Sequence, residues 1–466
     1  MFSLSQKLLC VSAISLLVGC GTTDMGDEVN EAVGEIRGSE TSAVPDSWTM
    51  SESVVTTEVD WVGSFNDAVL QKLIEEAQAN NKDLRAALAN VEYAQALARQ
   101  AGAGLKPSVG ITGSGSRSEG VSSGSSESTS LSLGAQVSWE VDLWGRVRSG
   151  ALAAVASQEA AEADYRYTQH SIAAATAKAY FTNIEAEIQL EIARENLKIA
   201  EETLRIATVK YDNGMASAQD LALSKSDFAT AKESLVSLEG SQRDAARSLE
   251  LLLGRYPSAE LTVRDSLPEV PAPPAAGVPS GLLERRPDLI AAERRVAAAF
   301  NATNQAKAAR LPSISLTGTV GGASNELSNL LNPSNVAWSL ASSLLAPLFD
   351  GGLGQAQVDA ASADQKAAIA AYGQAALIAF QEVETNLDQG VVLTRRIDEL
   401  KIAEEEISDA YRLAELLYKE GEVELLDLLS YQGRMISIRS SLASVKRLLL
   451  EQRVDLHLAL GGDWRG

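Results

Sequence analysis

Cysteine and histidine are almost absent from this chain of 466 residues. Cys10 and Cys20 are its two cysteines, and His170 and His457 are its two histidines. Because both cysteines lie in the first twenty residues, a disulfide framework or a cysteine-based metal site is excluded from the rest of the chain. A histidine-centred catalytic or zinc site is not expected, and we interpret both histidines as residues of helix surfaces.

Basic residues and long apolar runs are also scarce. Lys and Arg number 40 against 62 Asp and Glu, which gives a formal net charge of −22. Such a chain repels nucleic acid, so no nucleic-acid partner is expected. After the N-terminus no run of 18 apolar residues occurs, so no transmembrane helix is predicted there. Any part of this region that spans a membrane would therefore have to be built from β-strands.

The N-terminus is typical of an exported protein. Lys7 precedes an apolar run from Leu8 to Val18, which is too short for a permanent span and indicates a signal peptide of residues 1–19. The run ends in LVGC at Cys20, which resembles the bacterial lipobox. This resemblance implies that Cys20 carries a covalent lipid and that the polar residues 20–60 form a lipidated tether. A cleaved signal with an incidental cysteine is the alternative.

The chain repeats itself. YDNGMASAQDL, which begins at Tyr211, returns 207 residues later as YKEGEVELLDL, which begins at Tyr418. A shift of 205 places NNKDL, residues 80–84, on RRPDL, residues 285–289. One register kept over so long a stretch indicates an internal duplication. The predicted organisation is repeat 1 over 61–256, an extended Pro-rich linker over 257–281 and repeat 2 over 282–462.

Each repeat contains one predicted β-hairpin, over residues 107–143 and 312–348. From Leu131 to Leu143, apolar residues alternate strictly with Ser, Gly, Gln, Glu and Asp, so the strand has one apolar and one polar face. Four strands cannot close a barrel, and lipid tolerates no open sheet edge. A membrane barrel would therefore need several chains: two would supply eight strands and three would supply twelve. A soluble four-stranded sheet is the alternative.

The remainder of each repeat is predicted to be helical. Ala151 to Tyr211 contains no Gly or Pro over 61 residues, which could reach ~90 Å as a helix. Apolar residues recur every seven positions in two rows, which indicates neighbours on both sides of each helix. A two-helix rod is the alternative. Gly214 and Gly421 are predicted to take the left-handed conformation that ends a helix, at tight turns of two antiparallel helical hairpins.

Several motifs carry a family resemblance. They are DLWGRVR at residues 142–148, LLERRPDL at 282–289, ARLPSISLTG at 309–318, PLFDGG at 347–352, and the paired YxxGxxxxxDL turns. With the lipobox, they resemble the outer-membrane efflux proteins of the TolC/OprM family, on its lipoprotein branch. The resemblance implies a mixed α and β membrane protein. Four strands per chain would join a twelve-stranded barrel in a homotrimer, and the long helical hairpins would form a periplasmic α-helical barrel.

The resemblance also implies a function and partners. The chain is expected to lie in the outer membrane of a Gram-negative bacterium, anchored by the lipid, and to extend into the periplasm. It would conduct small molecules passively, with a periplasmic adaptor protein and an inner-membrane pump as partners. No enzymatic activity and no cofactor besides the lipid are expected. A duct for protein secretion and a non-conducting structural lipoprotein are the alternatives.

Two groups of candidate residues follow from the family pattern. The family narrows its periplasmic entrance with aspartates spaced D-x-x-D, and the matching stretch here is ELLDLLS. Asp427 fits the first position, Ser430 stands at the second, and Glu424 could supply another acidic ring, so these three are candidates for a periplasmic gate. The turns are candidate adaptor contacts, through Tyr211, Gly214, Asp220, Tyr418 and Gly421.

Overall fold

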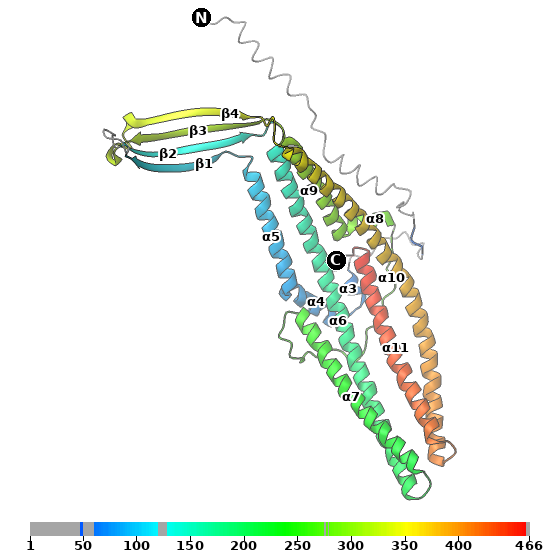
Figure 1. The fold of residues 1–466 in the computed structure, drawn as a ribbon. Coiled ribbons are helices and arrows are strands. Elements are labelled where there is room, and N and C mark those ends of the chain that lie inside the picture. The colour runs from blue at the N-terminus through cyan, green and yellow to red at the C-terminus, as the bar shows by residue number, and fades with distance from the viewer. Residues whose placement is uncertain (1–46, 50–59, 120–127, 275, 278, 463–466) are drawn as a thin grey trace. The chain divides into compact units, whose positions relative to one another are not determined.

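The computed structural model describes residues 47–49, 60–119, 128–274, 276–277 and 279–462 (Figure 1). The predicted signal peptide, Cys20 and most of the predicted tether lie outside the described residues. The described chain falls into two compact units. Among the described residues, one contains 97–119, 128–157 and 292–373, and the other contains 47–49, 60–96, 158–274, 276–277, 279–291 and 374–462.

The first unit contains an antiparallel sheet. Its four described strands lie in the order β1-β2-β3-β4, so the two hairpins join through the pairing of β2 with β3 (Figure 1). Two short 3-10 turns, η1 and η2, connect β3 to β4. The four strands expected from the alternating pattern are therefore present. The bounds are β1 Ser108–Ser118, β2 Ser128–Val141, β3 Ser313–Ser324, η1 Leu327–Asn329, η2 Pro333–Asn335 and β4 Val336–Leu345.

Helices make up most of the described chain, and two of them are very long. α6 has 67 residues and α10 has 68, and each is followed by a helix of 35 residues that forms the second arm of a hairpin. The bounds are α3 Trp61–Ser64, α4 Ala68–Asn80, α5 Lys82–Ala103, α6 Arg146–Asp212, α7 Ala218–Leu252, α8 Pro279–Arg285, α9 Pro287–Ala308, α10 Leu353–Glu420 and α11 Leu425–Ala459. In the described residues no helix is both long and apolar enough to cross a membrane.

The linker prediction is wrong at its end. Residues 257–281 were expected to be extended throughout, but α8 begins at Pro279. Proline lacks an N–H group and has a φ angle suited to helices, so it is well tolerated in a first helical turn. Here it starts a helix instead of prolonging the linker.

The main core of the second unit lies where α3 and α4 pack on α6, α7 and α11. Trp61, Phe65, Leu70 and Phe181 are buried there, and the ring of Phe65 lies against the rings of Trp61 and Phe181. His457 of α11 is stacked on Trp61, with ring centres 6.1 Å apart, and is only 2% exposed. The interpretation of His457 as a helix-surface residue is therefore wrong, because the short helix α3 covers this part of α11.

A second cluster anchors the described end of the tether. Trp48 is 3% exposed, packs near Phe380 and donates its Nε1–H to the carbonyl of Ala276 at 3.1 Å. Thr49 donates both its backbone N–H and its hydroxyl to Glu384. The tether is therefore fixed to α10 and to the linker at this point.

Candidate functional site

The sheet has two chemically different faces. Directly paired residues lie on the same face. Val320, for example, pairs with Ala135 on one side and Trp338 on the other. This apolar face is uncovered, with Trp338 79% exposed and Ile111 82% exposed. Its other large apolar members are Val109, Leu131, Leu133, Val137, Trp139, Val141, Ile314, Leu316, Val336, Leu340 and Leu344.

The opposite face is lined by small polar residues. Hydroxyl groups meet across neighbouring strands, at 2.7 Å between Ser114 and Ser132 and at 2.6 Å between Thr319 and Ser339. Matching contacts at 2.7 Å join Ser108 to Ser138 and Ser315 to Ser343. This hydroxyl face presents short groups that water can solvate readily.

Both outer strands have a free edge. In the part of the chain that the structure describes, β1 pairs with β2 alone and β4 pairs with β3 alone. Every residue of β1 and of β4 is exposed. Unpaired backbone N–H and C=O groups along these edges are available to another strand.

Two tryptophans, one in β2 and one just after it, bond to the connections that lead from α5 into β1 and from α9 into β3. Trp139 of β2 donates its Nε1–H to the carbonyl of Leu105, and Trp144 donates its own to the carbonyl of Pro312 at 2.8 Å. The carboxylate of Asp142 accepts the backbone N–H groups of residues 147 and 148 and so caps the start of α6. The DLWGRVR motif is therefore a rigid strand-to-helix junction.

The turn between α6 and α7 is held by a capping box. Gly214 has a φ of 72°, in the left-handed region. The Ser217 hydroxyl accepts the N–H of Asp220, and the Asp220 carboxylate accepts the N–H and the hydroxyl of Ser217. These hydrogen bonds, first of all the one from the Ser217 backbone, lower the pKa of Asp220. The structure thus occupies Asp220 in capping.

The turn between α10 and α11 is built differently. Gly421 has a φ of 87°, and Glu424 is the N-cap of α11 but makes no capping hydrogen bond with its side chain. Asp427, at the third helical position like Asp220, therefore has no capping partner. Within the described residues no hydrogen bond or ion pair involves the carboxylate of Asp427 or Glu424. Both residues and Ser430 are exposed, on successive turns of α11.

The two tyrosines of the turns have opposite surroundings. Tyr211 is 41% exposed, whereas Tyr418 is 4% exposed. Lys210 of α6 lies 4.2 Å from the centre of the Tyr418 ring and donates to the Tyr418 carbonyl, so the two hairpin tips are joined. Burial raises the pKa of the Tyr418 hydroxyl, and the charge of Asp220 raises it further.

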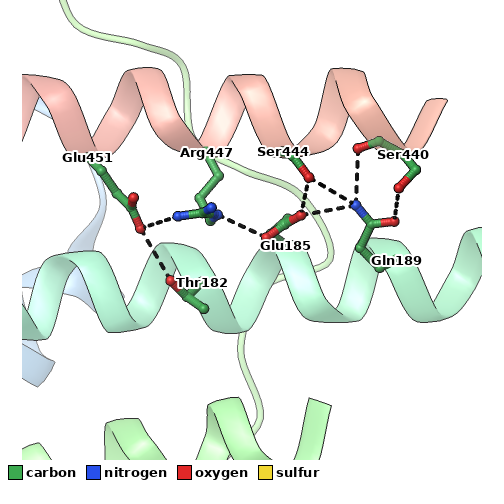
Figure 2. A network of polar contacts seen from close by, with 7 residues as sticks. All are labelled: Thr182, Glu185, Gln189, Ser440, Ser444, Arg447 and Glu451. Carbon is green, nitrogen blue, oxygen red and sulfur yellow. Dashed lines mark hydrogen bonds and ion pairs between the residues drawn. The ribbon is translucent and has the colours of Figure 1, made fainter. Parts of the chain in front are cut away.

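A polar network joins the two hairpins along α6 and α11, as Figure 2 shows. At its centre Arg447 donates to Glu185 at 2.9 Å and pairs with Glu451 at 2.5 Å. These three side chains are only 15–19% exposed. Partly desolvated charges are stable only where an oppositely charged or hydrogen-bonding partner faces each of them. The network therefore favours one register of α11 along α6. The other members are Thr182, Gln189, Ser440 and Ser444.

The RRPDL motif fixes a helix start. Arg286 is 3% exposed and donates twice to Asp288, at 3.0 and 2.8 Å. It also donates to Glu382 of α10 at 2.6 Å and to the carbonyl of Ala459, at the end of α11. This guanidinium therefore ties α9, α10 and α11 together.

The matching position in the first half of the chain makes an equivalent link with a different residue. Asn81 accepts the N–H groups of Asp83 and Leu84 and donates to the carbonyl of Leu252, at the end of α7. Asn81 and Arg286 occupy matching positions in NNKDL and RRPDL, and Leu252 matches Ala459 at the shift of 207. The matching position thus links the start of one helix to the end of a hairpin helix in both halves of the chain. An amide makes this link at Asn81, and a guanidinium makes it at Arg286.

Comparisons with known proteins agree with this architecture. The family model described as outer membrane efflux protein matches residues 73–255 and 278–462. The chain is 32% identical over 428 residues to the probable efflux pump outer membrane protein TtgC of Pseudomonas putida, covering 89% of this chain and 87% of that protein. It is 33% identical over 443 residues to the pyoverdine export outer membrane protein OpmQ of Pseudomonas putida, covering 91% and 93%.

A solved structure gives the same result for the fold. The outer-membrane channel OprN superposes with a TM-score of 0.83 at 30% sequence identity, over 91% of this chain and 98% of that one. The resemblance inferred from the motifs is confirmed, and the chain belongs to the outer membrane efflux protein family.

Proposed function

We propose that three copies of this chain close one twelve-stranded barrel and form a passive exit duct. Family membership makes the chain an outer-membrane channel component of an efflux system, one that works with an adaptor and an inner-membrane pump and is not an enzyme. The three-fold assembly is the proposal. The observation that carries it is the sheet, with one exposed apolar face, one hydroxyl face and two free edges.

Each property of the sheet fits a shared barrel. An apolar face as exposed as that of Trp338 and Ile111 is costly in water and favourable in lipid. The free edges of β1 and β4 would pair with neighbouring copies, which satisfies their backbone groups. The hydroxyl face would then line a wet lumen. Two copies would supply only eight strands, and side chains fill the interior of a barrel of that size.

Lipidation of Cys20 is part of the proposal. Support comes from the LVGC sequence that ends the apolar run. The anchored Trp48 lies 28 residues after Cys20, which allows a reach of up to ~95 Å for extended chain. A lipid at Cys20 could therefore enter the membrane while Trp48 stays fixed to the helical body.

The periplasmic gate is proposed at Asp427 and Glu424, with Ser430 in place of a second aspartate. Asp427 is exposed and uses none of its charge for capping, unlike Asp220. Three such carboxylates around one axis would repel one another and attract cations. The adaptor is proposed to contact the turns, where the exposed Tyr211 lies near Gly214, and where Asp220, Tyr418 and Gly421 set the turn geometry.

The duplication into repeats 61–256 and 282–462 is likewise proposed. The two segments that the family model matches and the twofold order of helix, two strands, long helix and helix support it.

The deciding experiment combines molar mass with conductance. We expect the lipidated protein, extracted in detergent, to have the mass of three chains and to conduct in planar bilayers. Asp427→Ala should raise single-channel conductance, because the shorter side chain widens the closed end, and Ser430→Asp should increase the preference for cations by adding a second carboxylate ring. Asp409→Ala, on the surface of α10, is the control and should change nothing. A stable monomer would refute the shared barrel, and unchanged conductance and ion preference in both tip variants would refute the gate.

For the lipid, Cys20→Ser should abolish labelling by a radioactive fatty acid. Normal labelling of that variant would exclude Cys20 as the acceptor.

A further inference from the structure

The hydroxyl face of the sheet is almost free of charge. Its members are Ser, Thr, Gly, Ala and Gln, with Leu345 at one end, and Glu140 is its single charged residue in the described strands. The pairing of Glu140 with Ser315 and of Ser138 with Thr317 places Glu140 on this face, one residue from the end of β2. Any charge that the strands present to the proposed lumen therefore comes from this position.

A basic residue cancels that charge. Arg146 is the first residue of α6, and its guanidinium donates two parallel hydrogen bonds to the Glu140 carboxylate, Nε to Oε1 at 3.0 Å and Nη2 to Oε2 at 2.6 Å. Such a bidentate pair is geometrically specific and stronger than one between neutral groups. The strand-to-helix junction thus contributes no net charge from this pair.

The pair is within reach of water. The two side chains are 36% and 31% exposed. Both residues border a cavity of about 380 Å³ towards Trp144 and Leu345 and a second one of about 260 Å³ towards Gln305. Both charges are therefore solvated, and dissolved ions that pass the junction can sense them.

We propose that Glu140 and Arg146 keep the strand-lined part of the duct non-selective for charge, by cancelling each other in a neutral ring at the inner end of the strands. The inference rests on the proposed three-fold channel. The strand-lined part would then pass solutes of either charge or none, because the rest of the hydroxyl face carries no fixed charge in the described strands. Selection by charge would then be left to the proposed gate and to the pump.

The size of the effect follows from barrel geometry. Strands about 4.8 Å apart and tilted by about 40° give twelve strands a backbone radius of about 12 Å, which leaves side-chain charges about 8 Å from the axis. Three unpaired charges at that distance, screened by 0.1 M salt, would enrich the favoured ion roughly threefold on the axis. Loss of either partner should therefore shift selectivity measurably, and in opposite directions.

The experiment is a charge cycle read as reversal potential in a tenfold KCl gradient. Glu140→Gln should move selectivity towards anions and Arg146→Gln towards cations, each with a roughly threefold change in ion enrichment. The double variant E140Q/R146Q and the exchanged pair E140R/R146E should both return to the wild-type value. Loss of packing alone would not produce shifts of opposite sign.

The outcomes separate the two proposals. Channels that conduct but keep the wild-type reversal potential in both single variants would overturn the inference and leave the duct intact. Absence of any conductance in the wild-type protein would refute the duct itself. If the single variants fail to fold, the double variants E140R/R146Q and E140Q/R146E carry one net charge of opposite sign at the same two positions and should shift the reversal potential in opposite directions. Equal potentials in these two variants would overturn the inference.

Discussion

Replacing Arg286 tests whether the two repeats close the same junction by interchangeable chemistry. Arg286→Ala removes three hydrogen bonds to carboxylates and one to the Ala459 carbonyl from a site that is 3% exposed. Removing one partner from a buried charge pair costs about 3–5 kcal/mol. Asp288 and Glu382 are 27% and 43% exposed, so water can solvate them in part, and we expect the lower end of that range.

Arg286→Asn should do better than alanine. The new amide would stand where Asn81 stands in the first repeat, with the N–H groups of residues 288 and 289 as donors to its oxygen. An N-cap of this kind contributes about 1 kcal/mol, and a hydrogen bond to the Ala459 carbonyl adds about as much. We therefore expect asparagine to recover about 1–2 kcal/mol of the loss.

Thermal unfolding of the purified protein, followed by circular dichroism, measures the order of stability. The expected order is wild type, then Arg286→Asn, then Arg286→Ala. Asn81→Ala is the matched variant in the first repeat and should cost about 1–2 kcal/mol. Equal midpoints for the asparagine and alanine variants would refute the argument that one position closes both junctions.

Three further variants test other parts of the structure. Gly254 has a φ of 72°, and a Cβ there would lie 2.6 Å from the Asn80 carbonyl oxygen, so Gly254→Ala should destabilise the folded protein by about 2 kcal/mol. Gly240 lies in open space on α7, and Gly240→Ala should slightly stabilise the protein. Equal thermal midpoints for the two variants would contradict this. Burial lowers the pKa of His457 to about 4, so the folded protein resists a proton that the unfolded chain binds below about 6.5. Stability should therefore fall as pH drops through that window, by about 2 kcal/mol at pH 5, and His457→Gln should remove this part of the loss in melts at pH 7 and pH 5. Arg447→Leu leaves two poorly exposed carboxylates without their cation and should cost about 3 kcal/mol in denaturant unfolding, while Arg205→Leu on the surface should leave the midpoint unchanged.

The strands and the long helices could be predicted because their signals are local. Strict alternation from Leu131 to Leu143 specifies both the strand and its two faces. Likewise, a stretch without Gly or Pro from Ala151 to Tyr211 leaves little besides one continuous helix. Such patterns need no knowledge of what lies across the interface.

The contacts between segments could not be predicted in the same way. Glu185 and Arg447 are 262 residues apart in the sequence, and the sequence around either residue gives no sign of the contact with the other. Lys210 and Tyr418 meet only because the two hairpin tips lie side by side. His457 was misplaced because α11 buries polar residues such as Gln432 and Arg453 as well, which hides the apolar stripe that would mark its inner face.

The helix-start aspartates also differ in how freely their positions can change. In the first turn the side chains of Ser217 and Asp220 are hydrogen-bonded to each other, so a substitution at one removes the partner of the other. We therefore expect these two positions to vary together among related sequences. In the second turn Asp427 makes no such bond, and Glu424 makes none either. There, mutation can alter charge without loosening the helix, and selection can tune this end of the molecule one residue at a time.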